Sequence, residues 1–111
     1  MVSRPIDLGQ APVGAREKTI ARLRAIEPEL RRRGVAGLRL FGSMARGQAT
    51  RSSDIDLLVR PVPGRLLSLL DLSDVRLCIS DRLGREASVV VEDDVAPEFM
   101  ARIAADLVTI Y

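Results

Sequence analysis

The chain has 111 residues, a formal net charge of +2 and 47% hydrophobic residues, which is the composition of one ordinary globular domain. It contains no histidine and a single cysteine, which excludes imidazole-based catalysis, histidine or cysteine-cluster metal sites and a disulfide framework. The remaining catalytic groups are carboxylates, hydroxyls, guanidinium groups and backbone amides. This set favours a hard cation with oxygen ligands, such as Mg²⁺.

The N-terminal residues and the absence of long apolar runs set the expected organisation. Residues 1–14 carry two prolines and two glycines without periodicity and predict an N-terminal arm, whereas residues 15–111 predict a single domain. No apolar run reaches the length of a membrane span or of a signal peptide. We therefore expect a cytoplasmic protein that does not bind membranes.

From Ala15 onward, apolar residues recur every three or four positions and predict an amphipathic helix that ends at Gly34. The apolar stripe consists of Ile20, Leu23, Ile26 and Leu30. Residues 35–41 then predict a short strand, and residues 43–48 one or two helical turns. A second predicted strand, residues 54–59, stops before Pro61.

The second half of the chain continues the alternation of helix and strand. Residues 66–83 predict a helix, although Ser73 and Asp74 could restart it as a new cap. Its expected core positions are Leu66, Leu69, Leu70, Leu77 and Leu83. Residues 86–91 predict a third strand, and Pro97 begins a last helix that runs to about residue 106. The order predicts an α/β or α+β domain with a small central sheet flanked by helices.

Two aspartates in the second predicted strand form the strongest local feature. Asp54 and Asp56 are two residues apart, so they project from the same face of a strand, about 6 to 7 Å apart at their Cα atoms. The neighbouring apolar residues, beginning with Ile55, occupy the opposite face and can pack against helices. Two adjacent anions repel each other unless a cation lies between them, and a divalent metal ion is the usual solution. An exposed pair at a sheet edge is the alternative interpretation.

A second group lies ten residues earlier, at the end of the first predicted strand. Gly42 allows close approach of a ligand to the backbone, and Ser43 supplies a hydroxyl beside exposed amides at a helix start. Arg46 is close enough in sequence to reach the same anion. The spacing predicts a phosphate-binding group and a metal-binding group on consecutive strands.

Together, residues 42–47 (GSMARG) and 53–59 (SDIDLLV) resemble the signature of DNA polymerase β-type nucleotidyltransferases. Among these, the chain is most similar to the minimal, MNT-type domains that act as antitoxins in pairs with HEPN toxins. The resemblance continues through residues 83–85, Pro97 and residues 107–111, and so covers nearly the whole chain after Ala15. It implies the polymerase β-like nucleotidyltransferase fold, built on a small mixed sheet.

The resemblance also implies roles for the residues of both motifs. Gly42 and Ser43 would hold the β- and γ-phosphates of ATP, and Asp54 and Asp56 would hold Mg²⁺ that bridges those phosphates. The implied reaction transfers AMP to a protein hydroxyl, which in the resembling antitoxins is a tyrosine of the HEPN partner. Because little chain remains outside this core, we do not expect direct nucleic acid binding. The sequence is compatible with a homo-oligomer and with a hetero-oligomer.

The sequence departs from the family at a third carboxylate, which the family carries on the following strand. The position expected for that aspartate is occupied by Ser88, and serine is a poor metal ligand and no general base at neutral pH. Glu86 has the same strand parity and could reach inward, or it could be a solvated residue at the strand start. Two hypotheses follow: an active transferase, or a pseudoenzyme antitoxin that acts by binding its partner.

Overall fold

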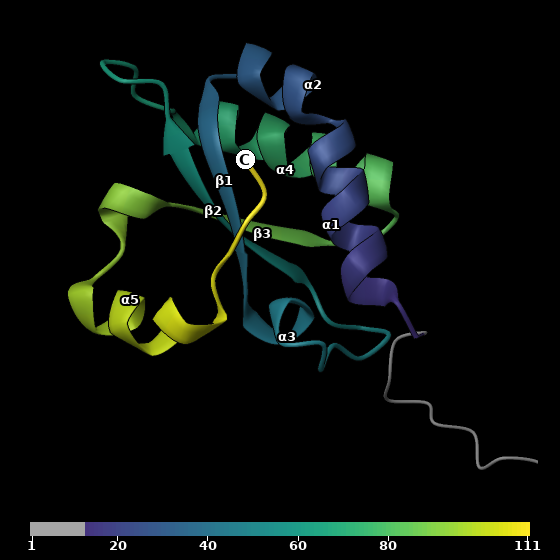
Figure 1. Ribbon diagram of the computed structural model, residues 1–111. Coiled ribbons are helices and arrows are strands. Elements are labelled where there is room, and N and C mark those ends of the chain that lie inside the picture. Colours follow the sequence, from purple (N-terminus) through teal and green to yellow (C-terminus); the bar gives the residue numbers. More distant parts are fainter. Residues whose placement is uncertain (1–12) are drawn as a thin grey trace, which may run out of the picture.

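The computed structural model describes residues 13–111, so residues 1–12 of the expected N-terminal arm lie outside the described range. The described chain forms a four-stranded sheet with the strand order β3-β2-β1-β4 (Figure 1). Strand β1 (Val35–Phe41) pairs antiparallel with β2 (Ile55–Pro61), and β2 pairs parallel with β3 (Ala87–Val91). The expected small mixed sheet is therefore confirmed.

A short fourth strand, β4 (Val108–Thr109), was not predicted from the sequence. It pairs antiparallel with Arg39 and Leu40 of β1 and forms the second edge of the sheet. Two residues are too few to show a period of two, so the sequence carries no strand signal there. The C-terminal segment thereby covers the edge of β1.

The predicted first helix is two helices. Helix α1 (Ala15–Ala25) and helix α2 (Glu27–Arg32) are separated at Ile26, whose backbone leaves the helical region with φ −98° and ψ 11°. The cause is Pro28 in the first turn of α2, because a proline ring clashes with the carbonyl of the residue four positions earlier. The apolar stripe survives the break, since its residues on both helices are buried.

The long helix α4 (Leu69–Leu83) begins at a defined cap. The Ser68 hydroxyl accepts a hydrogen bond from the Asp71 amide (3.1 Å), and the Asp71 carboxylate accepts one from the Ser68 amide (2.9 Å). This reciprocal capping box satisfies two amides at the helix start. The hydrogen bonds place the start at Leu69, and Ser73 lies inside the helix instead of restarting it.

Most leucines predicted to face the core from this helix are exposed, and that prediction was wrong. Leu66, Leu69 and Leu70 are exposed by 93%, 86% and 82%, and Leu77 by 48%. The buried residues of α4 are instead Val75 and Ile79. They belong to a stripe at three- and four-residue spacing, which also contains two partly buried leucines, Leu72 and Leu83. The leucine-rich sequence contains two possible apolar faces for this helix, and the face that is buried has fewer leucines.

The sheet separates two apolar clusters. Ile55, Leu57 and Val59 of β2 pack with helices α1, α2 and α4 on one face, which confirms the expected inward face of this strand. On the other face, Phe41 and Leu58 pack against helix α5 (Pro97–Ile103). Phe41 and Phe99 meet edge to face with their ring centroids 5.6 Å apart. Helix α5 ends three residues earlier than predicted, and residues Ala104–Asp106 form a 3-10 turn.

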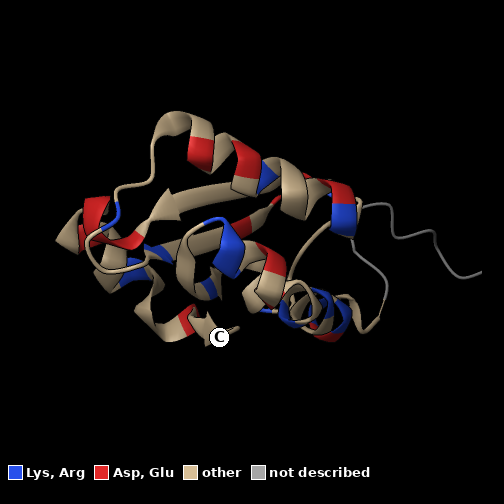
Figure 2. Cartoon of the chain, turned by 90° about the horizontal axis from the view of Figure 1, so that it is seen from above, with Lys and Arg blue, Asp and Glu red and all other residues tan. Residues whose placement is uncertain are grey.

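Figure 2 shows acidic and basic residues interspersed along the helices. Within residues 13–111, no helix combines the length and the hydropathy that a membrane span requires.

Candidate active site

The two sequence motifs meet at one end of the sheet. Strands β1 and β2 are antiparallel, so the last residue of β1 lies beside the first residues of β2, and Phe41 is the register partner of Asp56. The short helix α3 (Gly42–Ala45) follows β1 directly. The chain therefore brings Gly42 next to Asp56, although they are far apart in sequence.

Gly42 is in direct contact with the Asp56 carboxylate. Its φ of +76° lies in the left-handed region, where residues with a side chain are strained. A Cβ atom built on Gly42 would overlap the Asp56 Oδ2 atom. The site consequently requires glycine for two reasons: the backbone conformation, and the room that the Asp56 carboxylate occupies beside it.

Asp54 and Asp56 differ in their surroundings. Asp54 is exposed and directly precedes β2, whereas Asp56 is partly buried within it. Burial raises the pKa of Asp56 above its ordinary value, and the negative charge of Asp54 raises this pKa further, while Arg46 lowers it. The repulsion that the sequence predicted is thus present between the two aspartates, and a bound cation would relieve it.

Arg46 follows α3, and its guanidinium group is held by two acceptors. Its Nη1 atom contacts the Asp106 carboxylate at 2.9 Å, and its Nε atom donates to the Gln48 side chain at 3.1 Å. Asp106 is a neighbour of the site that the sequence reasoning missed, because no local pattern connects the end of the last helix with this loop. Ser43 is half-buried, and its carbonyl accepts the Gln48 amide at 2.8 Å.

These side chains fit a Mg²⁺ ion that is bound together with a nucleotide better than a metal ion held by protein ligands alone. Within residues 13–111, no group of three or more acidic, cysteine or histidine side chains is arranged around a common metal position. Mg²⁺ in nucleotide enzymes is typically held by one or two carboxylates together with the substrate's phosphates. Asp54 and Asp56 can supply those carboxylates, and the missing side chain of Gly42 leaves room for the Asp56 carboxylate against the backbone.

Ser88 lies beside Asp56 on the neighbouring strand. In the parallel pairing of β2 and β3, Asp56 is the register partner of Ser88. The Glu86 side chain is 75% exposed, and its carboxylate pairs with Arg76 of α4 at 3.6 Å. Glu86 is therefore a solvated residue at the start of the strand, and its side chain does not reach into the site.

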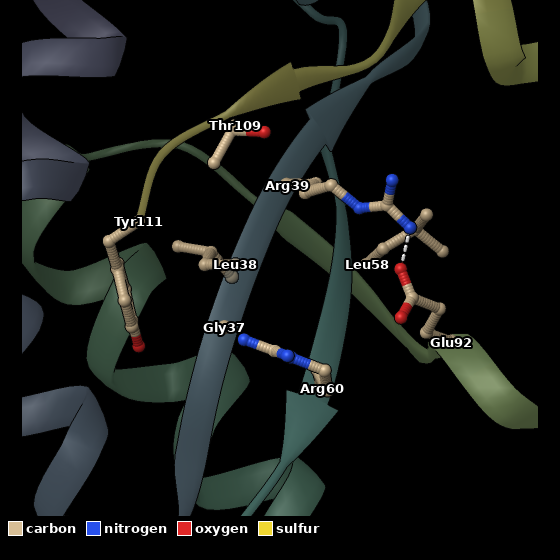
Figure 3. A pocket seen from close by; sticks show the side chains of 8 residues that line it. All are labelled: Gly37, Leu38, Arg39, Leu58, Arg60, Glu92, Thr109 and Tyr111. Carbon is tan, nitrogen blue, oxygen red and sulfur yellow. Dashed lines mark ion pairs between the residues drawn. The ribbon is translucent and has the colours of Figure 1, made fainter.

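A separate hollow of about 340 Å³ lies farther along the sheet (Figure 3). Arg39 and Arg60 project into it from neighbouring strands, and Arg39 pairs with Glu92. Arg60 lies flat over Gly37, where a Cβ atom would come within 2.8 Å of the guanidinium group. The full lining consists of Gly37, Leu38, Arg39, Leu58, Arg60, Glu92, Thr109 and Tyr111. None of the predicted site residues lines this hollow.

Comparison with known proteins identifies the family. Residues 23–108 match the model of the nucleotidyltransferase domain family. A Methanocaldococcus jannaschii protein named "putative protein adenylyltransferase" is 36% identical over 87 residues, which cover 78% of this chain and 91% of that protein. The chain therefore belongs to the nucleotidyltransferase domain family.

Solved structures agree with this assignment. One described as a "putative minimal nucleotidyltransferase" has 33% sequence identity and a TM-score of 0.72, with 88% of this chain and 98% of that chain covered. A toxin–antitoxin structure with AMP-PNP has 20% identity and a TM-score of 0.63, covering 86% and 72%. The complex of a tri-AMPylated Shewanella oneidensis HEPN toxin with its MNT antitoxin has 13% identity and a TM-score of 0.62, covering 86% and 71%. The latter two share the fold, which is that of the minimal nucleotidyltransferases and MNT antitoxins.

Proposed function

We propose that this protein is a Mg²⁺-dependent nucleotidyltransferase that transfers AMP from ATP to a hydroxyl group of a protein partner. The observation that carries the proposal is the contact between Gly42 and the Asp56 carboxylate, which brings the group expected to bind phosphate to the group expected to bind metal. The adenylyltransferase name of the M. jannaschii relative supports the nucleotide and the protein acceptor. The complex of an AMPylated HEPN toxin with its MNT antitoxin supports a HEPN-type toxin as partner. The tyrosine acceptor is what the resemblance to the MNT antitoxins implies.

Each site residue has a part in this reaction. Gly42 and Ser43 bind the β- and γ-phosphates, and the Arg46 guanidinium, fixed by Asp106, neutralises part of their charge. Asp54 and Asp56 would hold Mg²⁺, which when bound would supply positive charge beside the phosphates. The oxygen of the acceptor hydroxyl forms a bond to the α-phosphorus, and the bond from that phosphorus to the oxygen bridging to the β-phosphate breaks. Pyrophosphate leaves with that oxygen, and the hydroxyl proton is released to solvent. Orientation and charge neutralisation are the main catalytic contributions in such a site.

A second candidate is a pseudoenzyme antitoxin that keeps the fold and neutralises its partner by binding alone. The specific observation in its favour is Ser88 beside Asp56, where an aspartate would give a third carboxylate. A serine hydroxyl neither holds Mg²⁺ strongly nor accepts a proton at neutral pH. The two candidates share the fold and the partner and differ only in chemistry.

The test uses the full chain, ATP labelled at the α-phosphate and, as candidate partner, any HEPN-type protein found among the products of the neighbouring genes. We expect the partner to become labelled only when Mg²⁺ is present. ATP labelled at the γ-phosphate should leave the partner unlabelled, and so should the variant Asp56→Asn. Replacement of the partner's acceptor tyrosine by phenylalanine should abolish labelling. If the partner is bound and neutralised without any label, the transferase proposal is wrong and the pseudoenzyme remains.

A further inference from the structure

The connection between α4 and β3 holds the backbone on both sides of Asp54. Arg85 donates a hydrogen bond from Nη1 to the carbonyl oxygen of Ser53 at 2.7 Å, directly before Asp54. The carbonyl oxygen of Glu86 accepts the amide of Ile55 at 2.9 Å, directly after Asp54. Two consecutive residues of one connection therefore fix both peptide neighbours of this aspartate.

The same arginine closes the turn that leads to Asp54. Arg85 Nη1 also donates to the carbonyl oxygen of Thr50 at 2.8 Å. Within the turn, the Thr50 amide donates to the Ser53 hydroxyl at 2.8 Å, and the Ser53 amide donates to the Thr50 carbonyl at 3.3 Å. Hydrogen bonds from a charged donor are stronger than neutral ones, and both bonds from Arg85 are partly buried. Arg85 thus fastens a small closed turn to the body of the domain.

Asp54 depends on this turn for its position. It is exposed and lies one residue before β2 begins at Ile55. Within the part of the chain that the structure describes, its carboxylate forms no ion pair or side-chain hydrogen bond. Asp56, in contrast, is fixed inside the β2 ladder. A pair of metal ligands must keep a defined geometry, so the looser member needs support from its surroundings.

We propose that Arg85 is a positioning residue, which orients Asp54 so that it can bind a cation together with Asp56. The inference rests on the proposed function, because that proposal assigns the cation to these two carboxylates. Positioning and simple electrostatics have opposite consequences here. Removal of a positive charge near a cation site should strengthen cation binding by Coulomb's law, whereas loss of the turn should weaken it.

The experiment measures Mn²⁺ affinity by electron paramagnetic resonance of free Mn²⁺, at a temperature where circular dichroism shows every variant folded. The variants of the full chain are Arg85→Met, which removes both hydrogen bonds, and Arg85→Lys, which keeps the charge and one flexible donor group. Arg82→Met is the matched control, because it removes a positive charge from an arginine that pairs with Glu29 instead of the turn. Asp56→Asn defines the loss of the site.

We expect Arg85→Met to weaken Mn²⁺ binding roughly 10- to 100-fold, as losses of supporting residues around metal ligands do. Arg85→Lys should recover part of this affinity, and Arg82→Met should match the wild type. Amide hydrogen exchange at Ile55 should also accelerate in Arg85→Met, in the absence of metal. Wild-type affinity in folded Arg85→Met, or tighter binding, would overturn the inference alone. If the wild-type protein binds no Mn²⁺ through Asp56, the proposed function fails and the inference fails with it.

Discussion

Asp56 and Ser88 are register partners in the parallel pair of β2 and β3. Equivalent residues on adjacent strands of a sheet project to the same face, about 4.8 Å apart, so a carboxylate at residue 88 would lie beside Asp56. The present site has two carboxylates at the start of β2 and a hydroxyl at this third position. The identity of residue 88 is therefore the main chemical difference between the two candidate functions.

Ser88→Asp should strengthen Mg²⁺ binding and increase transfer about 10-fold or more, because the new carboxylate can bind metal and accept a proton. Titration calorimetry and the labelled-ATP assay measure the two effects. Ser73→Asp is the control, since it adds the same charge to a half-buried position on α4. Equal behaviour of both variants would show that the site lacks more than one carboxylate.

Gly42→Ala should weaken Mg²⁺–ATP binding about 100-fold, because the new Cβ displaces the Asp56 carboxylate and misplaced groups are costly at such sites. Gly64→Ala is the matched control. Gly64 has a similar φ of +82°, but a Cβ there meets no atom within 4 Å. Both variants carry a backbone cost of about 1 to 2 kcal/mol, and only Gly42→Ala should lose the nucleotide. Similar nucleotide affinities for the two variants would contradict the role of the contact.

Asp56→Asn should raise the free energy of unfolding of the metal-free protein at pH 7. The pKa of Asp56 is raised in the folded state by burial and by Asp54, so its contribution to stability is greatest at low pH and is lost as the pH rises through the folded pKa. Above that pH the ionised group destabilises the fold, and asparagine removes this charge. Denaturant titrations across pH 3 to 8 should show a flatter pH dependence for the variant. Asp93→Asn, an exposed carboxylate of the turn after β3, serves as the control.

The same variant reports on the cation. Mg²⁺ at 100 times its dissociation constant should stabilise the wild type by about 2.7 kcal/mol. It should not stabilise Asp56→Asn, which lacks one of the two ligands. Equal stabilisation of both proteins by Mg²⁺ would place the cation elsewhere.

Ile79→Ala should cost about 2 to 5 kcal/mol in the free energy of unfolding, because Ile79 is fully buried between α4 and the sheet. Leu69→Ala should change it by no more than about 0.5 kcal/mol, because Leu69 is 86% exposed. Urea denaturation of the two variants compares the two stripes of α4 directly. A large loss of stability in Leu69→Ala would contradict the burial of the α4 face that contains Ile79.

The parts of the site that the sequence could predict are those fixed by local geometry. Two residues at i and i+2 of a strand share a face, so the proximity of Asp54 and Asp56 follows from the chain alone. A glycine at the end of a strand indicates an unusual backbone or a close approach, and Gly42 has both. The resemblance to the nucleotidyltransferases added the relation between the two motifs.

The parts that could not be predicted depend on contacts between distant segments. Arg46 meets Asp106 across 60 residues, and Arg85 reaches the turn at residues 50–53 from the far end of α4. The inward stripe of α4 was also beyond the local pattern, because leucines occupy both candidate faces and only the packing against β3 and α1 selects one. The break at Ile26, in contrast, was visible in principle, since Pro28 stands two residues later.

Gly42 and Asp56 are proposed to belong to one magnesium–nucleotide site. Isothermal titration calorimetry of the purified protein with ATP, with and without Mg²⁺ and alongside Asp56→Asn, tests this proposal most directly. We expect the wild type to bind ATP only in the presence of Mg²⁺, and we expect Asp56→Asn not to bind it. If the folded wild type binds no ATP under any condition, this proposal is wrong. It is also wrong if Asp56→Asn binds ATP as tightly as the wild type does.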